Sequence, residues 1–277
     1  MNNEELIKKT KEVLNDYEAA KACLFFRLGG DLETNELTAA IPHTQIEDMS
    51  VTYHLLMDES GEETKSLLVT GAMVENWGVS VARLHQDAAE NTEMQHSPKI
   101  QTLSSMLGME PASDRDGYGN KLQFEDMLEK LDFKNSEMYV LTNFEGEGGA
   151  TVMCYPGVLE SIAEHAEKDF FVIPSSVHEM LILPDDGYFN LRDLKMIVKD
   201  VNESVVAPDE RLSDSVYHYD CTDRVFEKAE RFKERMAEKT MEKEPEKRLS
   251  IKEQLASAKE ECEKQTVTRK PQERALS

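Results

Sequence analysis

Apolar residues recur along this chain with spacings typical of both strands and helices. Alternation over residues 51–58 predicts a strand, and residues 66–70 fit its returning partner in a hairpin. Spacings of three and four predict helices over residues 3–22, from Ser80 through Ala89, and over residues 102–107, 122–131, 158–166 and 191–202. Ser80 and Asn190 stand where helix N-caps are expected. The buried stripe of the last helix is expected to consist of Leu191, Leu194, Ile197, Val198 and Val201.

The stretch from residue 138 to residue 185 carries the densest pattern. Two apolar runs, residues 138–142 and 150–155, flank a Gly-rich segment at 145–149 and predict a second hairpin. Two further strands are expected at residues 170–173 and 180–183, separated by a loop at residues 174–179. Together these elements predict an α+β fold, with mixed, mainly antiparallel sheets packed against helices.

The domain boundaries follow from composition. Residues 1–222 are expected to form the α+β domain, and residues 223–277 a charged tail that is either helical or disordered, with a coiled coil among the helical options. Residues 91–120 are polar and interrupted by Pro and Gly, so they are interpreted as a linker or surface insertion. On the linker interpretation, the domain divides into two subdomains, residues 1–90 and 121–222.

The charge is unevenly distributed. The chain has 32 basic and 55 acidic residues. Residues 223–277 contain 15 of the basic and 13 of the acidic residues, so the tail carries a net charge of +2. Residues 1–222 contain the other 17 basic and 42 acidic residues and carry −25. Nucleic-acid binders use clustered Lys and Arg to neutralise phosphates, and anionic membranes attract the same residues. Neither partner is therefore expected. A protein partner of unknown identity is expected. A basic one is compatible with this charge, but the favoured interpretation of the acidity is solubility.

The expected compartment is the cytoplasm. The first residues lack the apolar core of a signal peptide, and no apolar run approaches the length of a membrane span. Cys23, Cys154, Cys221 and Cys262 are far apart and form no CxxC pair, which favours free thiols.

Several short segments resemble an uncharacterised bacterial family, a domain of unknown function found in gut anaerobes. The resemblance covers residues 24–220, and members usually extend further at the N-terminus than this chain does. The segments that carry it include Ile41-Pro42-His43, Glu75-Asn76-Trp77-Gly78-Val79, Tyr155-Pro156-Gly157-Val158-Leu159 and Ile173-Pro174-Ser175-Ser176-Val177-His178-Glu179. The resemblance implies no activity, cofactor or catalytic residue. The segment at residues 249–255 also resembles tails on proteins of integrative conjugative elements, which implies an origin in a mobile genetic element.

The loop at residues 174–179 contains the only candidate catalytic residues, Ser175, Ser176, His178 and Glu179. A serine nucleophile needs a base within hydrogen-bond reach and a third group that orients the base. The strand–GxSxG–helix elbow is missing, and these polar side chains suit the capping of backbone groups at a turn. The structural role is the favoured interpretation.

No cofactor or metal is expected. His178 and Glu179 begin an HExxH pattern, but Ile182 occupies the position of the second ligand. The glycines of the segment at 145–149 are not followed by GK[ST], and the neighbouring Glu145 and Glu147 would repel a phosphate.

The sequence identifies no reaction. The favoured hypothesis is a non-enzymatic binding or accessory protein. The alternatives are a hydrolase that uses the loop at residues 174–179, and an acidic nucleic-acid mimic that binds a basic protein.

Overall fold

The computed structural model describes residues 3–32, 40–58, 64–111, 114–134 and 137–241. The first compact unit covers residues 1–229 and holds every strand described below. The second unit covers residues 230–277, of which residues 230–241 are described and are helical. The predicted tail motif at residues 249–255 lies outside the described residues.

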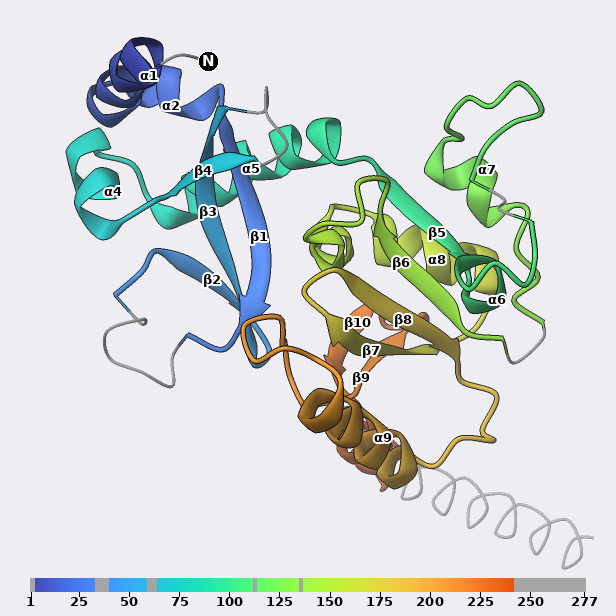
Figure 1. Cartoon of the computed structure of the whole chain (residues 1–277). Coiled ribbons are helices and arrows are strands. Elements are labelled where there is room, and N and C mark those ends of the chain that lie inside the picture. Colours follow the sequence, from blue (N-terminus) through green and yellow to red (C-terminus); the bar gives the residue numbers. More distant parts are fainter. Residues whose placement is uncertain (1–2, 33–39, 59–63, 112–113, 135–136, 242–277) are drawn as a thin grey trace, which may run out of the picture. The chain divides into compact units, whose positions relative to one another are not determined.

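The N-terminal sheet is built around one long strand (Figure 1). Its strands are β1 (Leu24–Gly30), β2 (His43–Ile46), β3 (Met49–Asp58) and β4 (Lys65–Leu68). One edge of β3 pairs with β1, while β2 and β4 share the other edge, and all three pairings are antiparallel. The alternating residues of β3, Met49, Val51, Tyr53, Leu55 and Met57, enter the main core. The predicted hairpin of residues 51–58 and 66–70 is confirmed.

Helices α1 (Asn3–Asn15), α2 (Tyr17–Lys21), α4 (Gly71–Trp77) and α5 (Val81–Gln95) accompany this sheet. The single helix predicted over residues 3–22 is divided at Asp16, whose carboxylate accepts a hydrogen bond from the Glu18 N–H at 3.0 Å. Ser80 caps α5 as predicted, by accepting from the Arg83 N–H at 3.2 Å. An N-cap acceptor satisfies one of the backbone donors that the first helical turn leaves free.

The second sheet has six antiparallel strands in the order β10-β9-β7-β8-β6-β5. They are β5 (Pro98–Thr102), β6 (Tyr139–Asn143), β7 (Phe170–Ser176), β8 (Glu179–Pro184), β9 (Tyr217–Asp220) and β10 (Val225–Lys228). The short helices α6 (Leu103–Met106) and α7 (Phe124–Leu128) lie between β5 and β6 along the chain. The sheets are thus antiparallel and packed with helices, as predicted.

Residues 91–120 do not form a simple linker. Residues 91–95 complete α5, and β5 follows almost at once as the edge strand of the second sheet. Pro98 and the polar residues of β5 obscure this strand in the sequence. Pro lacks a backbone N–H and is tolerated at strand starts and sheet edges, which is where Pro98 lies.

The predicted strand at residues 150–155 is wrong. These residues lie in a 3₁₀ helix, η1 (Gly149–Cys154), so β6 has no hairpin partner there and pairs with β5 and β8 instead. A Cβ at position 149 would collide with the Thr142 hydroxyl and the His178 carbonyl oxygen, so only Gly permits this close approach. Apolar composition alone does not separate a short buried helix from a strand.

The second sheet is covered on both faces. One face, with Phe170, Val172 and Ile182, joins the main core with α8 (Val158–Ala166). The other face packs Phe171, Ile173 and Leu183 against α9 (Leu191–Ser204). Of the predicted stripe of α9, Leu191, Leu194 and Val198 are buried, but Ile197 and Val201 are exposed. The predicted stripe is therefore wider than the sheet surface that receives it.

Two threonine hydroxyls accept hydrogen bonds from backbone N–H groups on the edge of β1 that does not pair with β3. The Phe26 N–H donates to Thr92 Oγ1 of α5 at 3.0 Å, and the Leu28 N–H donates to Thr151 Oγ1 of η1 at 3.0 Å. Both threonines are buried. Unpaired strand N–H groups are costly when buried and invite pairing with other chains when exposed. These two bonds remove both problems and tie the N-terminal sheet to η1.

The second sheet continues past the boundary predicted at residue 222. Strand β10 pairs with β9 over residues 225–228, and the Phe226 ring stacks on Tyr217 with centroids 5.1 Å apart. Ala229 is buried in the second core. The residues that the sequence assigns to the start of the tail therefore belong to the sheet.

Candidate functional site

The predicted catalytic loop is the tight turn of the β7–β8 hairpin. Strand β7 runs to Ser176 and β8 starts at Glu179, so only Val177 and His178 connect them. Ser175 Oγ donates to Glu179 Oε1 at 2.9 Å, and Ser176 Oγ accepts from the His178 backbone N–H at 3.1 Å. Each serine thus completes a local hydrogen bond of the hairpin.

The His178 ring contacts Gly148 and Glu210 rather than a serine hydroxyl. Its Nδ1 accepts the Gly148 N–H at 3.1 Å, which places the ring proton on Nε2, and Nε2 lies 3.5 Å from Glu210 Oε1. Its carbonyl oxygen accepts from Thr142 Oγ1 at 2.8 Å. The structure therefore brings the four predicted residues onto one turn but does not pair a serine hydroxyl with the imidazole, as nucleophilic catalysis requires.

We expect Ser175→Ala and Ser176→Ala each to lower the free energy of unfolding by about 0.5–1.5 kcal/mol, because each removes one partly buried hydrogen bond. Urea unfolding followed by circular dichroism measures this loss. A fluorophosphonate probe should leave the native chain unlabelled. Labelling that either substitution abolishes would show that the serine is a nucleophile.

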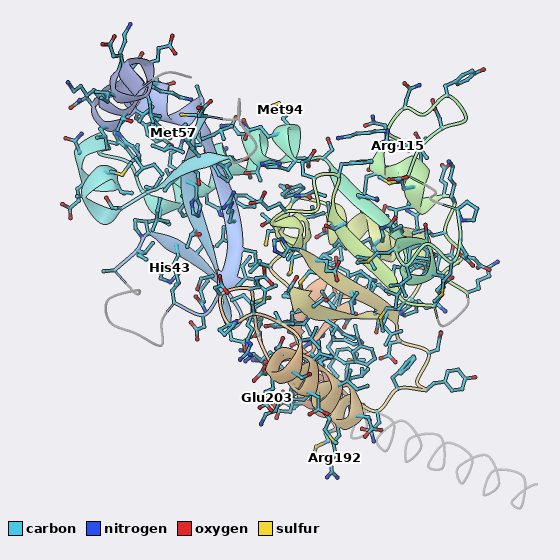
Figure 2. The ribbon with its side chains drawn as sticks, in the orientation of Figure 1. His43, Met57, Met94, Arg115, Arg192 and Glu203 are labelled. Atoms are coloured by element: carbon cyan, nitrogen blue, oxygen red, sulfur yellow. The ribbon has the colours of Figure 1, made fainter. Side chains whose placement is uncertain are left out.

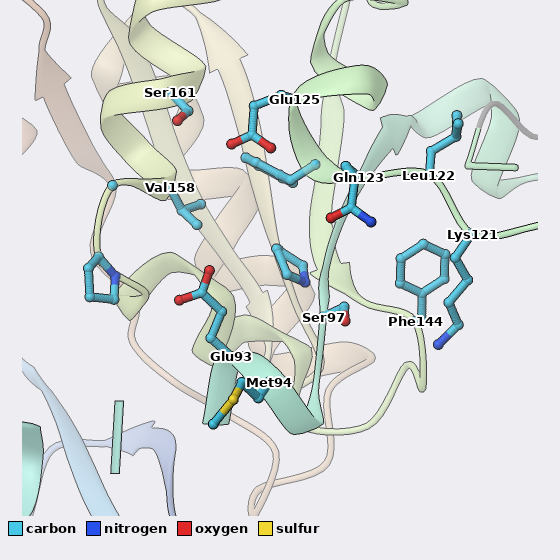
Figure 3. Close-up of a pocket in the computed structure, with 14 residues that line it drawn as sticks. Glu93, Met94, Ser97, Lys121, Leu122, Gln123, Glu125, Phe144, Val158 and Ser161 are labelled. Carbon is cyan, nitrogen blue, oxygen red and sulfur yellow. The ribbon is translucent and has the colours of Figure 1, made fainter. Parts of the chain in front are cut away.

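An open groove of about 490 Å³ lies elsewhere, among α5, α7 and α8 (Figure 3). Its size falls within the range of small-ligand sites. Apolar side chains form much of its wall, and Gln123 and Ser161 add neutral polar groups. The apolar wall residues are Met94, Pro98, Leu122, Phe124, Phe144, Pro156 and Val158.

Two carboxylates project into this groove from different elements. Glu93 comes from the last turns of α5 and Glu125 from the first turn of α7, and Figure 3 shows both carboxylates turned toward the space beside Val158. Within the described part of the chain, neither carboxylate has a hydrogen bond or an ion pair. The groove therefore presents uncompensated negative charge next to apolar surface.

The positive charge at the other end of the groove is neutralised. Lys121 Nζ lies 3.4 Å from Glu145 Oε1 and 4.5 Å from the centre of the Phe144 ring. Lys99, whose ammonium lies 5.8 Å from the same ring, is paired with the buried Asp114 at 2.9 Å. Both lysines thus serve to hold Phe144 in place, and the net charge available to a ligand is negative.

A second cavity, of about 360 Å³, lies beside β1 and the segment between β6 and η1. Three polar residues of its wall are hydrogen-bonded to the protein backbone through their side chains: Thr92, Asn143 and Thr151. On the same face of the N-terminal sheet, burial and the nearby Arg27 lower the pKa of His54 to about 4, so this imidazole is neutral near pH 7. Among the described residues that line this cavity, no nucleophile contacts a base.

Burial raises the pKa of the Cys154 thiol to about 12, so it stays protonated and unreactive near pH 7. Among the described residues, no three His, Cys, Asp or Glu side chains are placed to hold a metal ion. No helix in the described ranges is long and apolar enough to cross a membrane.

The fold and the groove define an α+β protein with two antiparallel sheets and an acidic, partly apolar groove. The chain belongs to a family of unknown function (DUF5688), whose model matches residues 1–221. This confirms the resemblance noted in the sequence and extends it to the residues ahead of Leu24. Comparison with curated proteins and with solved structures finds no match.

Sequence reasoning missed the residues of the groove. Glu93 and Glu125 are 32 positions apart, and the chain between them contains β5, whose sequence is typical of a linker. The only signal was indirect: the excess of acidic residues in the body of the chain. Which carboxylates remain unpaired depends on contacts between distant segments.

Proposed function

We propose that this protein is a non-enzymatic binding protein whose groove holds a basic segment of a protein partner. The observation that carries the proposal is the pair of unpartnered carboxylates, Glu93 and Glu125, beside an apolar wall. A Lys or Arg side chain suits such a site because its aliphatic stem packs on apolar surface while its charged end meets the carboxylates.

The charge of the whole chain supports the same class of partner. The chain carries a formal net charge of −23, which accelerates encounters with basic partners and slows encounters with acidic ones. Met94 and Val158 add apolar wall on which the aliphatic stem of a basic side chain can pack. A nucleic acid or an anionic membrane would be repelled by the same field.

The proposed compartment is the cytoplasm. Three cysteines of the described chain, Cys23, Cys154 and Cys221, are free thiols, which suits a reducing environment. The hydrolase and nucleic-acid-mimic alternatives stay predictions, as does the mobile-element origin.

We expect the full chain to bind a fluorescein-labelled peptide of alternating arginine and proline, which cannot form a helix. Replacing Glu93 and Glu125 together by Gln should raise the Kd by about tenfold, or ~1.4 kcal/mol, because two charge contacts are lost while the shape is kept. Fluorescence anisotropy measures the Kd, and rising salt should weaken the native complex.

The matched control carries the same change in net charge at exposed positions outside the groove, Glu12→Gln with Glu75→Gln. This control should bind the peptide as the native chain does. If both double variants weaken binding equally, the peptide responds to the general field of the chain, and the groove is not its site.

A further inference from the structure

Helix α9 carries an apolar strip that the sheet leaves uncovered. The strip consists of Ile197 and Val201 on α9 and Val205 at its C-cap, which are 59%, 37% and 77% exposed. Its neighbours Leu194 and Val198 are buried against β7 and β8. Figure 1 shows α9 on the outer side of the second sheet, and Figure 2 marks its two ends by Arg192 and Glu203. An exposed strip of large apolar residues on a helix is a typical docking surface.

The charges of α9 are separated around its axis. At about 100° per residue, Asp193 and Asp200 lie within about 60° of Ile197, on the solvent side of the strip. Arg192, Lys195 and Lys199 lie about 140–160° away, on the other side of the helix. Asp193 and Asp200 are exposed and, across the described ranges, have no ion pair or side-chain hydrogen bond. Along α9 the apolar strip is therefore edged by acidic groups, while at its C-terminal end the Arg211 side chain donates to the Val206 carbonyl oxygen at 3.1 Å.

We propose that this strip docks an amphipathic helix of a partner protein, with Lys or Arg beside its apolar residues. The apolar side chains of the partner would cover Ile197 and Val201, and its basic residues would meet Asp193 and Asp200. A second copy of this chain fits poorly, because an α9–α9 contact through the strip brings four aspartates together. The strip is independent of the groove proposed above, since it lies on the other face of the second sheet from α8.

The test uses the full chain and a fluorescein-labelled peptide that forms a basic helix, with leucine at every third or fourth position and lysine elsewhere. Ile197→Ser combined with Val201→Ser should raise the Kd measured by anisotropy at least about tenfold. Met196→Ser is the control, because Met196 is 55% exposed but lies on another side of the helix. It should change the Kd by less than about twofold. The variants should melt at the native temperature, since these side chains are exposed.

Charge is tested separately. Asp193→Asn with Asp200→Asn should weaken binding by about three- to tenfold and flatten its salt dependence, whereas Glu203→Gln should change neither. The matching peptide with glutamate in place of lysine should not bind. Three results would overturn the proposal: native affinity in the Ile197/Val201 variant, loss of binding in the Glu93/Glu125 variant instead, or equal binding of the glutamate peptide. Sedimentation showing a dimer of the full chain that Ile197→Ser dissolves would assign the strip to a second copy.

Discussion

Ending the chain after residue 222 should lower the free energy of unfolding by about 4 kcal/mol, a large part of the 5–15 kcal/mol typical of a domain. The deletion removes β10 and leaves β9 as an unpaired edge, which also favours aggregation. It removes the stacking of Phe226 on Tyr217 and the 2.9 Å contact from Lys228 to Asp48. An aromatic pair contributes about 1 kcal/mol and a hydrogen bond to a charged group about 1.5–3 kcal/mol.

The stability of a truncated chain should depend on whether it retains β10, not on how much of the tail is removed. A chain ending at residue 241 keeps β10 and the helix that follows, and we expect its urea unfolding curve to match that of the full chain. Size-exclusion chromatography should show the shorter chain, 1–222, as expanded or aggregated. Equal stability of the two truncated chains would show that β10 contributes little to the sheet.

The second large effect concerns Asp48, in the turn between β2 and β3. Its carboxylate accepts from the hydroxyls of Ser213 at 2.9 Å, Ser215 at 2.8 Å and Tyr217 at 2.5 Å, and from Lys228 Nζ at 2.9 Å. One carboxylate thus joins the N-terminal sheet to β9, β10 and the segment before them. We expect Asp48→Ala to cost about 3 kcal/mol, because four polar groups lose their acceptor at once.

The stabilisation by the Asp48 carboxylate should be lost at acid pH, when the carboxylate becomes protonated. Burial raises the pKa of Asp48, but the bonds from Tyr217, Lys228, Ser215 and Ser213 outweigh it and hold the pKa at about 2, below the ordinary value of 3.8. A carboxylate with a lowered folded pKa stabilises the fold above its unfolded pKa and loses that effect as pH falls through the folded one. The stabilisation is therefore complete above about pH 4 and lost towards pH 2, with a size of about 2 kcal/mol.

The measurement is urea unfolding of the native chain and of Asp48→Asn between pH 2 and pH 7. The variant should be less stable at pH 7, and the difference from the native chain should shrink as the pH falls. Asp200→Asn serves as the control for the loss of one carboxylate, since the Asp200 side chain is exposed and has no ion pair or side-chain hydrogen bond within the described ranges. A difference that stays constant with pH would mean that the Asp48 pKa is not lowered by folding.

Local chemistry made part of the fold predictable. The β3–β4 hairpin follows from alternating residues, and Ser80 and Asn190 cap α5 and α9 as N-caps do elsewhere. The family follows from short segments spread over the chain. These features depend on neighbours in sequence, which is why a single sequence contains them.

Contacts between distant residues decided the rest. Residues 150–155 are apolar enough for a strand, yet Gly149 must fit against Thr142 and His178, and this closeness selects a 3₁₀ helix. Ile197 is as apolar as Val198, but only Val198 meets the sheet. In the sequence, Lys228 resembles the other charged residues of the tail. In the structure it forms an ion pair with Asp48, which lies 180 positions earlier. Alternation and composition report what a residue could bury, whereas tertiary structure determines which surface is there to receive it.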